Sequence, residues 1–234
     1  MREIETPLTL RLWTVDEYHR MAEAGILQPD ERIELLTGQV IEKYSDWTPR
    51  LWRVDEYYRM AEVGILQSDE RVELIAGQVI TKMSPQGTPH ATTITLTRLL
   101  LESRLGGQVL VRPQLPIRLN NYSEPEPDVA VVMPDALRYL DHHPMPSEIY
   151  LLIEVADTTL KGDCNLKANN YAKSGIADYW VIDVKNRQLH VFREPTQNGY
   201  QSEVILSADD SISPLQFSDL SIAISEMLPP VSVS

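Results

Sequence analysis

Cysteine is almost absent from this sequence: its 234 residues include one, Cys164. A lone cysteine excludes an intramolecular disulfide framework and a four-cysteine zinc site, and it fits a reducing compartment. Long apolar runs are absent too, since a run such as 149–153 falls far short of the roughly 20 residues that cross a bilayer. The opening stretch MREIETP lacks the apolar core of a secretory signal. We therefore expect a soluble, cytoplasmic protein with no membrane partner.

Basic residues are also in short supply. Lys and Arg number 21 against 34 Asp and Glu, which gives a formal net charge of −13. So acidic a balance argues against a surface built as a whole to grip nucleic acid. It leaves room for a local basic groove, because exposed charges are largely screened beyond about 8 Å at physiological salt. The hydrophobic share of 43% and the charged share of 24% are ordinary for a globular chain and exclude wholesale disorder.

An internal repeat occupies the N-terminal third of the chain. Residues 11–45 and 50–84 are offset by 39 positions and are identical at 26 of 35. Each copy predicts a helix that ends at a glycine, followed by a hairpin, at 33–36 and 39–43 in the first copy and at 72–75 and 78–82 in the second. Two copies are too few for a solenoid.

The repeat predicts the domain organisation. Only the second copy runs directly into the rest of the chain. We interpret residues 1–49 as an N-terminal extension that contains a partial duplicate of 50–84. Residues 50–234 then form the main domain, with a loosely ordered tail after Ser211. The first copy is interpreted as an added layer, a swapped element or a dimer contact.

The remaining sequence predicts an α/β sandwich, a mixed sheet flanked by helices. Apolar and glycine patterns place helices at 90–104 and 165–174 and an extended pair over 108–119, broken at Pro113 and Pro116. Buried strands are expected at 128–133 and 149–155, and further strands at 179–183, 188–192 and 203–206.

Two carboxylates flank the strongest predicted strands. Asp128 opens one, in the motif Glu-Pro-Asp, and Glu154 lies near the end of the next inside an apolar run, where an unpaired charge is costly. If these strands run antiparallel, the two acids converge and offer the oxygen ligands that Mg²⁺ prefers. Lys167, on the following helix, can position a nucleophile or neutralise a phosphorus-centred transition state. The alternative interpretation is that both acids are solvated strand ends.

The strings PEPDVAVV and IYLLIEVADTTLKGDCNLKANNYAKSGIADYWVID resemble the restriction-endonuclease-like family with PD-(D/E)XK nuclease architecture that is expanded in cyanobacteria. The segment 73–90 resembles the N-terminal signature of that family, and the resemblance extends over about residues 50–228. It implies a restriction-endonuclease-like fold, a mixed central sheet with helices on both sides, and an acidic metal site.

Carried over residue by residue, the resemblance makes Asp128 the PD aspartate and Glu154 the second metal-binding carboxylate. The lysine expected two residues after Glu154 is replaced by Ala156. In this family the lysine role has moved to the following helix, where Lys167 is the candidate and Tyr171, at i+4, can pack against its stem.

Other polar residues are weaker candidates. Glu73 alternates with apolar residues in a strand and can extend the acidic site, and His90 begins a helix, where a cap or loop role is common. Asp163 is interpreted as a helix cap, Cys164 as a bystander, and the run 141–143, Asp-His-His, as a loop rather than a metal site.

These residues, with the resemblance, predict a Mg²⁺-dependent endonuclease that hydrolyses phosphodiester bonds in DNA, with Mn²⁺ as an alternative ion. Nucleases of this kind often act as dimers, so the resemblance also implies a homodimer. Segments 98–118 and 161–193 each carry a net charge of +3 and flank an acidic block, 119–160, that carries −7. Basic flanks around a metal-binding floor suit a nucleic acid, although ordinary solvated faces explain them as well. The alternatives are a non-catalytic binding or assembly protein with the nuclease fold, and a hydrolase of small phosphoesters.

Overall fold

A computed structural model describes residues 9–43, 47–82 and 87–230. The chain divides into two compact units. We call the first the sheet unit; its described residues are 87–119 and 125–230. The second, the repeat unit, comprises the described residues of 9–82 together with 120–124. The sequence-based boundary at residue 49 stays a prediction about domain organisation.

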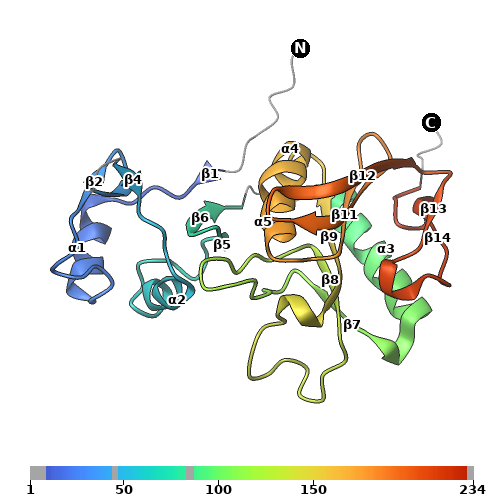
Figure 1. Cartoon of the computed structure of the whole chain (residues 1–234), viewed down its shortest axis with the longest axis horizontal. Coiled ribbons are helices and arrows are strands. Elements are labelled where there is room, and N and C mark those ends of the chain that lie inside the picture. The colour runs from blue at the N-terminus through green and yellow to red at the C-terminus, as the bar shows by residue number, and fades with distance from the viewer. Residues whose placement is uncertain (1–8, 44–46, 83–86, 231–234) are drawn as a thin grey trace, which may run out of the picture. The chain divides into compact units, whose positions relative to one another are not determined.

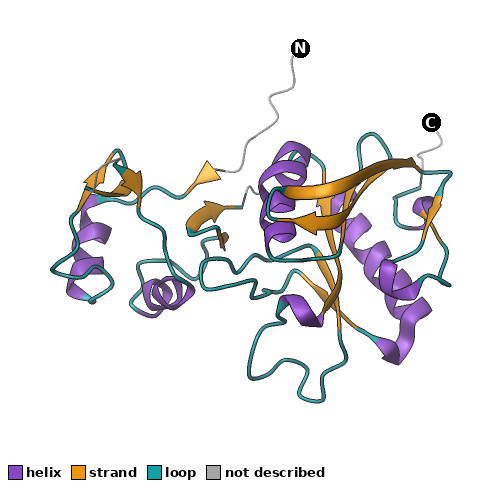
Figure 2. Ribbon diagram, viewed as in Figure 1, coloured by secondary structure: helices purple, strands orange, loops and turns teal. Residues whose placement is uncertain are grey.

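The repeat unit contains one helix and one hairpin from each copy of the repeat (Figure 2). In the first copy these are α1 (Val15–Glu23), β2 (Ile33–Leu36) and β3 (Gln39–Glu42). In the second they are α2 (Val54–Glu62), β5 (Val72–Ile75) and β6 (Gln78–Thr81). A short strand precedes each helix, β1 (Thr9–Leu10) and β4 (Thr48–Pro49). The predicted helices and hairpins of both copies are therefore confirmed.

Local chemistry explains these elements. Helix α1 begins with a capping box, in which the Thr14 side chain accepts from the Glu17 backbone and the Glu17 carboxylate accepts from the Thr14 backbone. The hairpin turns have positive φ at both central residues, at Thr37-Gly38 (47° and 82°) and at Ala76-Gly77 (50° and 76°). That is the backbone of a two-residue turn whose twist matches the flanking strands.

The sheet unit is built on a six-stranded mixed sheet in the order β12-β11-β10-β9-β8-β7. Strands β9 and β10 are parallel and all other neighbours are antiparallel. Its strands are β7 (Leu110–Pro113), β8 (Val129–Val132), β9 (Ile149–Ala156), β10 (Asp178–Asp183), β11 (Gln188–Thr196) and β12 (Gly199–Ser207). The mixed α/β architecture predicted from the sequence is confirmed.

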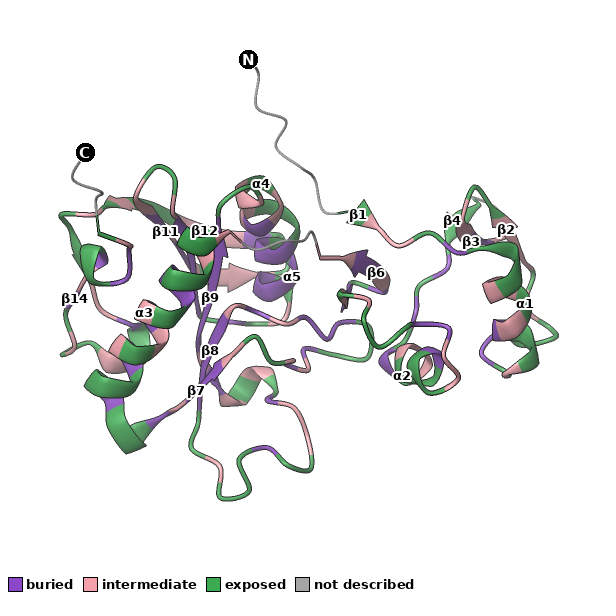
Figure 3. Cartoon of the chain, turned by 180° about the vertical axis from the view of Figure 1, so that it is seen from behind, coloured by how far each residue is buried: buried purple, intermediate pink, exposed green. Residues whose placement is uncertain are grey.

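Helices cover both faces of this sheet (Figure 1). Helix α3 (Thr88–Leu105) packs on one face through Ile94, Leu101 and Leu105. Helix α5 (Ala168–Lys173) packs on the other through Ala168 and Tyr171. Strands β8 and β9 lie between these two cores and are buried along nearly their whole length (Figure 3). A charge on β9 therefore has to find its partners inside the protein.

A single-turn π-helix interrupts the connection between the parallel strands. The chain leaves β9, forms α4 (Leu160–Gly162), widens into the π-turn Asp163–Lys167 and continues as α5 before it enters β10. Such turns occur frequently at functional sites. This one contains Lys167.

The segment after Ser211 differs from the loose tail that the sequence predicts. Residues 211–230 form β13 (Ser211–Ile212), β14 (Ile222–Ala223) and 3-10 turns at Leu215–Phe217 and Ile224–Glu226. Ile222, Ile224 and Met227 are fully buried in the core under α3. Asp178 accepts from the Leu215 backbone at 2.8 Å, which ties the segment to β10. The apolar residues of this segment are few and widely spaced, so they give no periodic signal in the sequence. In the structure they complete the core.

Two smaller differences concern the loops. Of the extended pair expected over 108–119, only β7 is a strand; a 3-10 turn, Gly106–Gln108, precedes it, and another, Pro146–Glu148, precedes β9. The prolines at 113 and 116 cannot donate backbone hydrogen bonds to a neighbouring strand, which explains the early end of β7.

Within the described ranges, no helix is long and apolar enough to cross a membrane.

Candidate active site

The register of β8 against β9 brings Asp128 to Glu154. The two strands are antiparallel, with Val129 opposite Ile153, so the start of one meets the end of the other. Asp128 immediately precedes β8, and its Oδ2 accepts from the backbone N–H of Val155 at 2.9 Å. The convergence expected of an antiparallel pair is present.

Glu154 is a buried carboxylate with partners on the neighbouring helical segment. Only 3% of the residue is exposed. Its Oε1 accepts from Lys167 Nζ and from the Tyr171 hydroxyl, each at 2.9 Å. A lone buried carboxylate would be strongly disfavoured, and these two donors keep its charge stable inside the sheet unit.

The π-turn places a second acid beside Lys167. Asp163 lies 3.8 Å from Lys167 Nζ and is itself buried. Its Oδ2 accepts from the Thr159 hydroxyl at 2.6 Å, a contact that holds the turn in place. Lys167 thus lies between two carboxylates, which fixes the position of its ammonium group.

His90 lies near the other carboxylate oxygen of Asp128, Oδ1. It is in the first turn of α3, and its Nε2 is 3.4 Å from Asp128 Oδ1. That nitrogen is buried and has no hydrogen-bond partner among the residues that the structure describes. An orphaned polar atom in such a place is one that water or the hydration shell of an ion would satisfy.

The surroundings of Asp128 favour its ionised form. Burial opposes ionisation, but the His90 contact, the charge of Lys167 and the Val155 N–H outweigh it and hold the pKa of the Asp128 carboxyl below its ordinary value.

Burial raises the pKa of the Cys164 thiol to about 12. That thiol is protonated at neutral pH and is no nucleophile, in agreement with its interpretation as a bystander.

Two side chains gain a role that the sequence did not reveal. Gln114 follows β7 in the left-handed region, with φ of 50°, and its side-chain amide donates to Asp128 Oδ1 at 3.3 Å. Strained backbone of this kind clusters at functional sites. Tyr171 does more than pack against Lys167, because its hydroxyl reaches Glu154 directly. The i+4 spacing indicated the neighbourhood of Tyr171, whereas nothing in the sequence marked Gln114.

Glu73 belongs to the repeat unit and not to the sheet unit that contains the other four candidates. It lies on β5, is 1% exposed and has Lys82 Nζ at 3.9 Å. Its part in catalysis stays a prediction. The 83–86 portion of the family-like segment lies outside the described residues. The Asp-His-His run is a loop, as expected, where His142 contacts Asp141 at 2.7 Å and Glu148 at 3.2 Å.

The arginines of segment 98–118 are largely engaged elsewhere. Arg98 lies 3.6 Å from Glu102, and Arg104 donates to Glu226 at 2.9 Å. Arg112 is buried and lies over the Tyr139 ring at 5.2 Å. Solvated and structural roles therefore explain most of this predicted basic flank.

The donor chemistry of the site fits Mg²⁺. This ion is held in many sites by one or two carboxylates, with water and phosphate oxygens in the remaining positions, and Asp128 and Glu154 provide two. In the described part of the chain, no group of three or more His, Cys, Asp or Glu side chains is gathered for a metal. The two carboxylates and the orphaned His90 nitrogen fit an ion that keeps much of its hydration shell.

A mixed sheet with an acid pair at the adjoining ends of two central strands, and a lysine on the helical segment that follows, defines a nuclease-like α/β protein. Comparison with known families agrees. Residues 54–225 match the family model described as "Uma2: Putative restriction endonuclease", and the chain belongs to this family.

A solved structure is similar as well. It is described as "Crystal structure of a putative nuclease belonging to DUF820 from Anabaena variabilis ATCC 29413 at 1.96 A resolution", and it is 18% identical with a TM-score of 0.58. The match covers 75% of this chain and 96% of that one, which supports the fold. No curated protein matches the chain.

Proposed function

We propose that this protein is a Mg²⁺-dependent endonuclease that hydrolyses phosphodiester bonds in DNA. One observation carries the proposal: Asp128 and Glu154 meet at adjoining strand ends, with Lys167 on the second carboxylate at 2.9 Å. Family membership supports the same class of activity.

The chain's own residues have separate tasks in this proposal. Asp128 and Glu154 hold the ion, which when bound supplies a Lewis acid and an activated water. Asp128 stays ionised at neutral pH because its pKa is lowered. Lys167 offers a compact positive charge to the attacking water or to the pentacoordinate phosphorus, while Tyr171 keeps the Glu154 carboxylate in one orientation.

A cleavage assay tests the proposal. The wild-type chain is incubated with supercoiled plasmid and with single-stranded DNA in Mg²⁺, Mn²⁺ or excess chelator. We expect cleavage with either metal and none with the chelator. Asp128→Asn and Glu154→Gln should each lower the rate at least about 100-fold, because each removes a ligand charge without changing shape.

Asp141→Asn is the matched control, since that exposed acid contacts His142 in the loop. Its cleavage rate should equal that of the wild type. Equal cleavage by wild type, Asp128→Asn and Glu154→Gln would overturn the assignment of the site.

A non-catalytic binding or assembly protein is the second candidate. Two observations favour this function. The expected lysine is replaced by Ala156, and Glu154 Oε1 already accepts hydrogen bonds from Lys167 and Tyr171. Titration calorimetry separates the two functions: the nuclease binds Mg²⁺ at millimolar concentration and Asp128→Asn does not, whereas a folded wild-type chain that releases no heat supports the second candidate.

A further inference from the structure

The two copies of the repeat exchange their leading strands. Strand β1 precedes the first copy but pairs with β6 of the second, where Leu10 lies opposite Ile80. Strand β4 precedes the second copy but pairs with β3 of the first, where Pro49 lies opposite Ile41. Leu10 and Pro49 are 39 positions apart, and so are Ile41 and Ile80, which is the offset of the repeat. The same pairing therefore occurs twice, in opposite directions.

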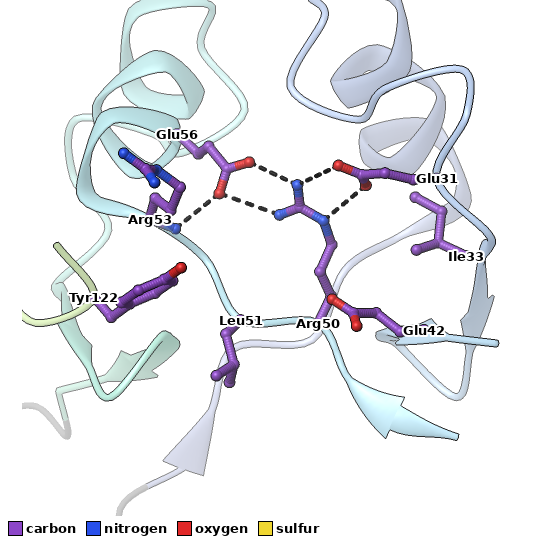
Figure 4. Close-up of a pocket in the computed structure, with 8 residues that line it drawn as sticks. All are labelled: Glu31, Ile33, Glu42, Arg50, Leu51, Arg53, Glu56 and Tyr122. Atoms are coloured by element: carbon purple, nitrogen blue, oxygen red, sulfur yellow. Dashed lines mark hydrogen bonds and ion pairs between the residues drawn. The ribbon is translucent and has the colours of Figure 1, made fainter. Parts of the chain in front are cut away.

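The ion pairs between the copies follow the same rule. Arg11, in the first copy, pairs with Glu70 of the second at 3.0 Å. Its counterpart Arg50, in the second copy, pairs with Glu31 of the first at 2.9 Å (Figure 4). Each arginine also bonds a glutamate six residues later in its own copy, at Glu17 and Glu56. Every partner is again related by the offset of 39.

The equivalent tryptophans meet at the centre of this arrangement. Trp13 and Trp52 lie edge to face with 5.6 Å between ring centroids. Each ring is covered by the arginine of its own copy, Arg11 at 4.3 Å and Arg50 at 4.6 Å. A residue that meets its own counterpart marks the axis of a two-fold interface. Met21 and Met60, fully buried, lie in the shared core.

The pocket beside Arg50 belongs to this interface. It is lined by residues of both copies, among them Glu31 and Glu56, and by Tyr122 of segment 120–124 (Figure 4). Its volume of about 260 Å³ lies below the usual range of small-molecule sites, roughly 300–1,000 Å³. Its central charge, Arg50, is already bound by two glutamates. We therefore interpret the pocket as part of the interface between the two copies and not as a ligand site.

Outside this face, two pairs of equivalent positions in the described parts of the copies are buried to different extents. On the second copy, Val54 and Ile75 are buried at 0% and 1% exposure, and the Val54 backbone donates to Asn121. Their counterparts in the first copy, Val15 and Leu36, are 65% and 49% exposed. The first copy therefore reproduces the pairing face of the second but not the burial of Val54 and Ile75.

We propose that the second copy carries a self-association face whose partner is another copy of the same element, and that the first copy fills this face within the chain. A two-fold contact of this kind ordinarily joins two identical subunits. Tethering makes it intramolecular, with an effective concentration in the millimolar range for a short linker. The duplication thus gives the chain its own partner at this face, and undocking the first copy creates a dimer through the second.

Sedimentation velocity on the full chain tests this. Met21→Asp places a charge in the first copy's core, so that copy undocks. We expect the mass of the Met21→Asp chain to be twice that of the wild type at tens of micromolar. Adding Glu70→Arg should return it to the wild-type mass, because Arg50 of one chain then faces an arginine of the other. Circular dichroism and cooperative melting confirm that each chain is folded.

A second variant leaves the first copy's own core intact. Glu31→Arg opposes Arg50 within the chain, while the pairing of Arg50 with Glu70 between two second copies stays complementary. Its dimer fraction should rise with concentration, and Glu31→Arg/Glu70→Arg should remain at the wild-type mass. The proposal is overturned if neither Met21→Asp nor Glu31→Arg doubles in mass, or if the doubling survives Glu70→Arg.

Discussion

In the sheet unit, Glu154 and Lys167 are a buried pair that occurs once, and Asp163 and Asp128 crowd the same place. In the repeat unit, the buried Arg50 has its own glutamate, a second from the other copy, and a counterpart in Arg11. Like charges gathered at one buried site oppose folding through mutual repulsion, whereas a cation between two partly exposed carboxylates avoids that repulsion. The first arrangement is typical of chemistry and the second of assembly, and three variants test that difference.

The largest effect is expected from neutralising the sheet-unit pair. Replacing a buried ion pair by apolar groups of similar volume is often neutral or stabilising. Glu154→Met/Lys167→Met replaces both charged side chains by apolar ones of similar length, so it should keep or raise the melting temperature while plasmid cleavage falls at least about 100-fold. Calorimetric melting and cleavage rates are measured on the same preparation.

Arg193→Met is the control for this double variant. It breaks another ion pair of the sheet unit, with Asp178 at 2.9 Å. We expect a lower melting temperature and an unchanged rate per folded molecule. A double variant that loses stability as well as cleavage would show that the Glu154–Lys167 pair is structural.

The second effect concerns the repeat unit. Arg50→Met leaves Glu31 and Glu56 without their shared cation, and a buried pair broken on one side costs about 3–5 kcal/mol. Because these glutamates are partly exposed, we expect a loss of about 2 kcal/mol in unfolding free energy, measured by urea denaturation, with cleavage unaffected.

The neighbouring Arg53→Met is the matched control. Arg53 pairs with Asp55 where both side chains are about half exposed or more. Such exposed pairs contribute little to stability, because water and salt screen the two charges, so we expect a much smaller loss than for Arg50→Met. If Arg50→Met and Arg53→Met lose the same unfolding free energy, burial does not make the Arg50 ion pairs more stabilising than the exposed Arg53 pair.

Local patterns predicted the elements of both units, and strand ends predicted the meeting of Asp128 with Glu154. Apolar alternation reports which face of a strand is buried, and adjacent strands in sequence are usually neighbours in space. The exchange of β1 and β4 was beyond reach, because two copies with the same sequence offer the same pairing within a copy and between copies. Gln114 was missed since its role depends on a positive φ and not on its neighbours' pattern. The packing of residues 211–230 was missed because isolated apolar residues carry no period.

The smallest effect is a pH dependence confined to the repeat unit. Burial opposes ionisation of Glu17, but Arg11 and the Thr14 donors prevail and lower its pKa from 4.5 to about 2. A carboxyl whose folded pKa is depressed stabilises the fold above about pH 4.5, and this contribution disappears as the pH falls toward 2. Glu17→Gln should therefore be less stable than the wild type at pH 7, and urea denaturation at stepwise lower pH should show the difference shrinking to nothing. Glu23→Gln, an exposed change on the same helix, should track the wild type throughout. A Glu17→Gln deficit that stays constant down to pH 2 would assign the loss to helix capping through the Thr14 backbone, and the ionic pairing of Arg11 would then contribute nothing to the contrast between the two units.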